Sequence, residues 1–179
     1  MRNNNKAKQL TFAALMLALA IASQFLKNLS VYITGPIVNT TLLLTVLYSD
    51  LGMASILAVI LPITSFIITG SPLMAIVPTI IPVVMLGNFA IVLMVSLIYG
   101  RSSAKSNGRL AISLAIGSIV KAAVMGALIV FLILPVFGGE LKPPQIEVAK
   151  MTFSLTQLYT AAIGSAFTFI IWPIIKKIK

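Results

Sequence analysis

The chain has 179 residues, of which 59% are hydrophobic and only 9% are charged. Ordinary globular proteins carry about 25% charged residues, so this composition excludes a water-soluble surface and indicates an integral membrane protein. The net charge is +10, but the basic residues cluster between apolar runs, which is typical of membrane topology signals rather than of a nucleic-acid interface. The absence of cysteine and histidine excludes disulfides, thiolate or imidazole chemistry and the usual zinc ligands.

Apolar segments along the chain predict six membrane-spanning helices, which form a single all-α membrane domain over residues 1–179. In chain order these helices are expected at about 9–26, 39–48, 52–68, 83–99, 109–134 and 151–172. Gly35-Pro36 is interpreted as a turn before the second helix, and Pro135 as the end of the fifth. Ser49 or Asp50 is expected to cap the third helix.

The segment 69–82 is apolar but contains Gly70, Pro72, Pro78 and Pro82. Three prolines exclude one straight helix and predict a partly buried loop or a broken helix. Non-helical backbone at membrane depth is tolerated where protein covers it or where it lines a cavity. This segment is therefore a candidate wall of a binding site.

The basic residues indicate the orientation of the six helices. Nine of them lie in the two termini and the loop at 101–109, whereas three lie in the loops on the other side: Lys27, Lys142 and Lys150. The positive-inside rule then places the N-terminus and the C-terminus in the cytoplasm.

Lys121 is the most unusual residue, because it lies in the middle of the apolar run 109–134. A lysine near the bilayer centre costs about 2.5–3.5 kcal/mol on insertion scales, and no acidic residue lies within a predicted span to pair with it. Two interpretations are open. Lys121 contacts a ligand in a pocket, or it snorkels to an interface or bonds to a neighbouring helix.

Three amide side chains, Asn39, Asn88 and Gln157, lie at predicted membrane depth toward the outer half of the protein. Each can join two helices by a hydrogen bond, which is the structural interpretation. Their shared position near the outer end favours a second interpretation, a polar pocket that also contains Lys121.

Small residues form a strip along the first predicted helix, where Ala14, Ala18 and Ala22 recur every four residues. Such a strip lets another helix approach closely. Ordinary packing inside the protein is the alternative explanation.

Several motifs are missing from the sequence. It has no Walker motif and no pair of carboxylates for acid–base or metal chemistry, so we expect no enzyme, no metal and no cofactor. Energy for active transport would come from another subunit or from an ion gradient. Proton coupling is disfavoured because no carboxylate or histidine lies within a predicted span.

Over essentially its whole length the chain resembles the substrate-binding S components of energy-coupling-factor (ECF) vitamin transporters. The length, the six helices and the basic ends carry this resemblance, together with four local elements. These are the strip Ala14-x-x-x-Ala18, the stretch Gly35 to Asn39, the proline-rich segment before the fourth helix, and Gly87-Asn88.

The resemblance implies a substrate-binding subunit of an ABC-type importer in the plasma membrane of a bacterium. It implies that Ala14, Ala18 and Ala22 face a membrane coupling subunit, and that two cytoplasmic ATPases supply the energy. It also implies a ligand pocket near the outer face. No nucleic acid is expected among the partners.

Combining this pocket with the polar residues gives the candidate substrate-binding residues Lys121, Asn88, Gln157, Asn39 and Tyr159. A buried cation without a protein counter-ion favours a vitamin-like ligand with a carboxylate or phosphate. Tyr159 and other aromatic residues near the outer face are expected to stack on a ring of the ligand.

Two other classes of protein stay open. A stand-alone secondary carrier or facilitator would support uptake without ATPase subunits. The other class is a membrane-embedded enzyme or a structural assembly factor. The enzyme would have only Lys121, serines and threonines for chemistry. Recovery of a larger membrane subunit and two ATPases in a pull-down would distinguish the S component from both.

Overall fold

The computed structural model describes residues 2–26, 30–100 and 106–178, and every regular element within these ranges is helical. In chain order the helices are α1 (Arg2–Gln24), α2 (Val31–Tyr48), α3 (Leu51–Thr69), α4 (Pro72–Ile76), α5 (Ile80–Val95), α6 (Asn107–Leu128), α7 (Leu134–Phe137), α8 (Pro143–Phe153) and α9 (Leu155–Ile175). Two π-helical turns, η1 (Ser96–Gly100) and η2 (Ile129–Ile133), and a final 3₁₀ turn, η3 (Lys176–Ile178), complete the set.

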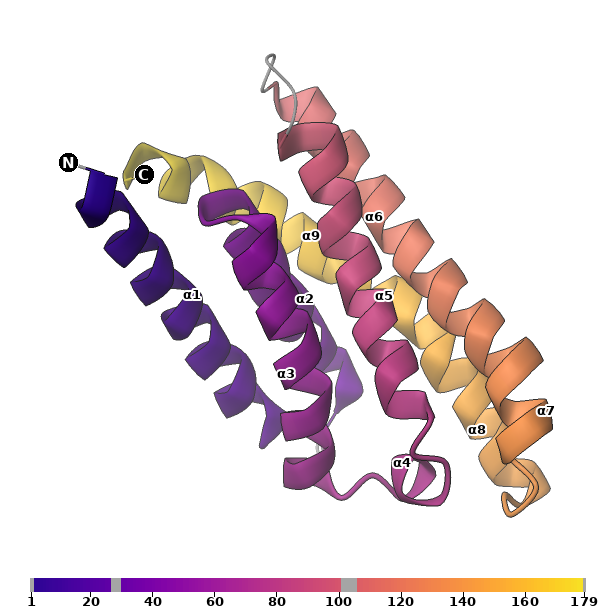
Figure 1. The fold of residues 1–179 in the computed structure, drawn as a ribbon. Helices are drawn as coiled ribbons and strands as arrows, with labels where there is room; N and C mark the ends of the chain where they lie inside the picture. Colours follow the sequence, from indigo (N-terminus) through magenta and orange to yellow (C-terminus); the bar gives the residue numbers. More distant parts are fainter. Residues whose placement is uncertain (1, 27–29, 101–105, 179) are drawn as a thin grey trace.

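Six helical segments of the described chain are long and apolar enough to cross a membrane, which confirms the predicted all-α membrane fold. The two termini lie at the same end of the bundle, and α4 and the turn between α7 and α8 lie at the opposite end (Figure 1). This arrangement fits the predicted even number of spans. Lys27, Arg101, Lys105 and Lys179, which contribute to the predicted orientation, lie outside the described residues.

Helix α2 is the central helix of the bundle. In the described chain 67% of its span is buried, against 28% to 39% for the other five. It packs against α1, α3, α5 and α9, whereas α1 packs mainly against α2 and α3 at one side of the bundle (Figure 1). The described part of the chain therefore leaves one face of α1 uncovered.

Local side-chain hydrogen bonds define where two of the spans begin. The carboxylate of Asp50 accepts a hydrogen bond from the backbone N–H of Met53 at 2.8 Å, so Asp50 rather than Ser49 is the cap of α3. Ser106 caps α6 in the same way, through the N–H of Arg109.

The second span begins at Val31, eight residues earlier than the predicted start at Asn39. The prediction of a turn at Gly35-Pro36 is wrong, because both residues lie inside α2. Ser30 caps the helix, and the side-chain amide of Asn39 donates to the carbonyl of Gly35 at 2.9 Å. These bonds support the helix around the proline, whose missing N–H removes only one backbone bond.

The fifth span continues beyond Pro135, which was the predicted end, and α7 reaches Phe137. The π turn η2 precedes the proline, and the N–H of Leu134 bonds to the carbonyl of Ile129, five residues back. Such a turn shifts the hydrogen-bond register. The helix can therefore accommodate the missing donor of Pro135.

The sixth span begins as α8 at Pro143 and is interrupted at Ser154, so its predicted start at residue 151 is wrong. Proline is favoured in the first turn of a helix, where no N–H is needed. The side-chain carbonyl of Gln145 also accepts from the backbone N–H of Lys142 at 2.8 Å. Pro143-Pro144 therefore starts a helix instead of extending a loop.

The segment between the third and fourth spans is broken, as predicted. Gly70 ends α3 with a left-handed φ of 56°, and the short helix α4 follows before α5 starts at Ile80. The predicted bounds of the third span, 52–68, differ from those of α3 by one residue at each end.

Candidate functional site

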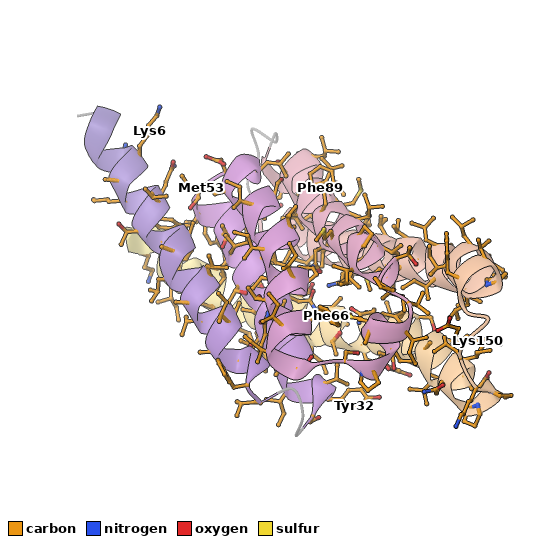
Figure 2. The ribbon with its side chains drawn as sticks, turned by 60° about the horizontal axis from the view of Figure 1, so that its bottom comes forward. Lys6, Tyr32, Met53, Phe66, Phe89 and Lys150 are labelled. Atoms are coloured by element: carbon orange, nitrogen blue, oxygen red, sulfur yellow. The ribbon has the colours of Figure 1, made fainter. Side chains whose placement is uncertain are left out.

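A cavity of about 140 Å³ lies at the end of the bundle opposite the termini, beneath α4. Its walls come from the last turn of α1, the first turns of α2, the second half of α3, the helix α4, and parts of α5, α6, α8 and α9. Figure 2 turns this end of the bundle toward the viewer. The proline-rich segment predicted to line a cavity contributes Ser71, Leu73 and Met74 to its wall.

Three polar residues meet at one wall of the cavity. The ammonium of Lys121 on α6 donates to Oδ1 of Asn39 on α2 at 2.6 Å and to Oδ1 of Asn88 on α5 at 2.8 Å. All three side chains are almost fully buried, with exposed fractions of 2%, 1% and 3%. We call them the Lys121 cluster; it joins α2, α5 and α6 through residues 82 and 33 positions apart in the sequence.

The two asparagines present their carbonyl oxygens to Lys121. Nδ2 of Asn39 donates to the carbonyl of Gly35, which leaves its Oδ1 directed at the ammonium. Asn88 accepts through Oδ1 as well, so its Nδ2 is turned away from the ammonium. Asn88 and Lys121 both line the cavity, and both side chains carry N–H donors.

Lys121 makes no ion pair within the described part of the chain, whereas Lys150 pairs with Glu147 on α8. A lysine ammonium has three donors, and the two asparagines use two of them. Buried charges are usually paired, because desolvation penalises an isolated one. An anionic group in the cavity would both accept the third hydrogen bond and balance the charge.

Gln157 lines the same cavity, but Tyr159 does not. Gln157 lies in the first turn of α9, where its Nε2 donates to the carbonyl of Thr152 on α8 at 3.3 Å, across the break between the two helices. Tyr159 is 58% exposed on the outside of α9. Phe153, which is buried, is the aromatic side chain that the cavity wall contains among the described residues.

Gln24 also lines the cavity and was not predicted from the sequence. A polar residue directly after an apolar run is normally interpreted as the point where the helix leaves the membrane. Gln24 lies at the end of α1, is 2% exposed, and its Nε2 donates to the carbonyl of Leu61 on α3 at 3.0 Å. Its Oε1 is buried and has no partner among the described residues.

The comparisons with known proteins identify the family. A family model described as "ECF transporter, substrate-specific component" matches residues 8–176. The chain belongs to this family. No curated protein and no solved structure matches it. The S component therefore has the multi-pass membrane fold that its sequence resemblance implies.

The alanine strip of this S component lies on the uncovered face of α1. Ala14, Ala18 and Ala22 are not buried in the bundle, whereas Ala13 and Ala20 are. Packing inside the protein therefore does not explain the strip. A face of small residues that a second helix can approach closely is available on the outside of α1.

Proposed function

We propose that this S component binds a small, vitamin-like micronutrient with a carboxylate or phosphate and delivers it to an ATP-driven importer in the plasma membrane of a bacterium. The observation that supports this proposal is the Lys121 cluster, a buried cation without an anionic partner in the described chain, at the wall of a cavity. The ligand's anion supplies the missing counter-charge, and Asn39 and Asn88 hold the ammonium in place for it.

The position of the cavity supports uptake as the direction of transport. The cavity lies at the end of the bundle opposite the termini, which the positive-inside rule places outside the cell. The ligand thus enters from the outside. The chain acts as a binding subunit rather than an enzyme, and the energy comes from a membrane coupling subunit and two cytoplasmic ATPases.

The proposal is tested by mass spectrometry of small molecules released when the detergent-purified protein is denatured. We expect one anionic compound at near-stoichiometric amount. A wild-type protein that releases no anionic compound, even after incubation with a vitamin mixture, would contradict the proposal.

The exposed strip on α1 is the proposed contact with the coupling subunit. Replacing Ala14 and Ala18 by leucine fills this surface, so we expect recovery of the coupling subunit in a pull-down to fall by about tenfold or more. Ligand binding should stay unchanged, because neither residue lines the cavity.

A matched control is available on α6, where Ala111 and Ala115 are also exposed and also four residues apart. The double leucine variant at these positions should recover the coupling subunit like the wild type. Equal losses from both double variants would show that the strip on α1 has no special role.

A further inference from the structure

The side-chain carbonyl oxygen of Gln24, a residue that lines the cavity, is a buried hydrogen-bond acceptor without a donor among the described residues. Gln24 closes the end of α1, lines the cavity and is 2% exposed, and its Oε1 has no partner among the described residues. A buried acceptor without a donor loses its hydration and gains nothing in return. Because Gln24 lines the cavity, this oxygen is a site at which a ligand can donate a hydrogen bond.

The orientation of the Gln24 amide is fixed by its other partner. Nε2 donates to the carbonyl of Leu61 at 3.0 Å. Turning the amide over would place two carbonyl oxygens face to face, because a backbone carbonyl cannot donate. Oε1 is therefore held as an acceptor, and a water or ligand that meets it must donate.

The opposite chemistry lies at the Lys121 cluster. The third hydrogen of the Lys121 ammonium is a donor without a partner in the described chain, and Lys121 lines the cavity. The residues that line the cavity therefore include a positively charged donor, Lys121, and an acceptor, Gln24. The lining also contains apolar side chains, among them Val38, Met74 and Phe153.

The volume limits what can bridge these groups. An apolar cavity of about 150 Å³ holds a molecule of the size of benzene. The cavity here, about 140 Å³, is of similar size and sets the scale of the ligand at about one small ring.

We propose that the ligand is a molecule of about one ring that carries an anionic group for Lys121 and a separate N–H or O–H donor for Gln24. This inference rests on the proposed function and adds the ligand's hydrogen-bond donor and the ligand's size. Gln24 then determines specificity, since anions of the same size whose remaining part is hydrocarbon or only accepts hydrogen bonds leave its Oε1 unpaired.

The test uses a defined equimolar mixture of benzoate, its amino- and hydroxy-substituted derivatives, and the matching benzamides. Purified protein is incubated with the mixture, washed and denatured, and the retained compounds are quantified by mass spectrometry. The wild type should retain the best substituted benzoate about tenfold more than benzoate, the factor that one good hydrogen bond gives. The uncharged benzamides should not be retained.

Gln24→Met should retain benzoate and its derivatives about equally, because methionine has a similar length but no carbonyl. This variant also loses the bond to Leu61, so it can be less stable. The ratio of two compounds retained by one sample does not depend on the fraction that is folded. Thr79→Val is the control, since Oγ1 of Thr79 is also buried without a described partner but Thr79 does not line the cavity.

The outcomes separate the two proposals. If benzoates are retained only when Lys121 is present but Gln24→Met keeps the wild-type preference, a water satisfies Gln24 and the inference is wrong, whereas the proposed function stands. Retention of no benzoate overturns the inference on size. The proposed function fails separately if the protein also releases no anionic compound acquired in cells or from the vitamin mixture.

Discussion

Replacing Lys121 by methionine is expected to weaken binding of the anionic ligand by at least about 100-fold. Methionine fills a similar space, but it removes the positive charge and the hydrogen-bond donors of a residue that lines the cavity. The ammonium donates to Asn39 and Asn88 at 2.6 and 2.8 Å, so its position does not depend on the ligand. The measurement is the amount of the ligand that stays with the purified protein, followed by a titration of the ligand-free form.

Stability should respond much less than binding to the loss of Lys121. Removing a buried charge relieves its desolvation, whereas the carbonyl oxygens of Asn39 and Asn88 lose their donor, and these two effects oppose each other. We expect the melting temperature of ligand-free Lys121→Met to lie close to that of the ligand-free wild type. A structural role for Lys121 alone would produce the reverse, a large loss of stability with unchanged affinity.

Lys150→Met is the matched control for this experiment. Lys150 is a second lysine at the same end of the bundle, but it is 44% exposed and pairs with Glu147 at 3.4 Å (Figure 2). Exposed pairs of this kind contribute little free energy. Affinity should therefore stay within about twofold of the wild type. An equal loss in both variants would mean that the general charge of this end attracts the ligand and that the Lys121 cluster does not bind it.

The overall fold could be predicted because membrane spans leave a strong signal. Long apolar runs and clustered basic residues fix the number of spans and their direction, whatever the packing. The starts of the second and sixth spans, at Val31 and Pro143, were less visible, since prolines close to a helix start resemble those of a loop. Whether such a proline starts a helix or extends a loop depends on side-chain caps, which only the folded chain shows.

The candidate site was partly visible in the sequence because a lysine inside an apolar run needs an explanation. Which helix faces meet is harder to predict, since a membrane helix is apolar on most sides. Gln157 and Tyr159 are two residues apart, so they point about 160° apart around α9 and cannot both face one cavity. Gln24 was not predicted because it is polar and follows an apolar run, which suggests an exposed helix end. Its burial and its contact with Leu61 on another helix appear only in the folded chain.

Gly164→Ala is expected to destabilise the fold more than an alanine at Gly87 or Gly108. A Cβ atom at Gly164 would lie 2.7 Å from Cβ of Asn39 and 2.8 Å from the carbonyl oxygen of Pro36, both on α2. Backbone cannot move aside as a side chain can, so α2 and α9 must move apart. Overpacking of this kind lowers the free energy of unfolding by about 1–3 kcal/mol.

The two other glycines give a graded comparison by thermal unfolding. At Gly87 the new Cβ would meet the flexible side chain of Met125, which can change rotamer, so Gly87→Ala should be less damaging than Gly164→Ala. Gly108 has open space around it and lies in the first turn of α6, so Gly108→Ala should be neutral or slightly stabilising. A different order of the three variants would contradict the close approach of α2 and α9.

Gly164→Ala should also weaken ligand binding, although Gly164 does not line the cavity. The atom that it displaces belongs to Asn39, whose Oδ1 holds the Lys121 ammonium at 2.6 Å. A shift of α2 that is tolerable for packing is large for a hydrogen bond, whose strength falls steeply with distance and angle. We expect affinity to fall by about tenfold or more in protein that is still folded at the temperature of the measurement. Wild-type affinity in a destabilised Gly164→Ala protein would show that ligand binding does not depend on the position of Asn39.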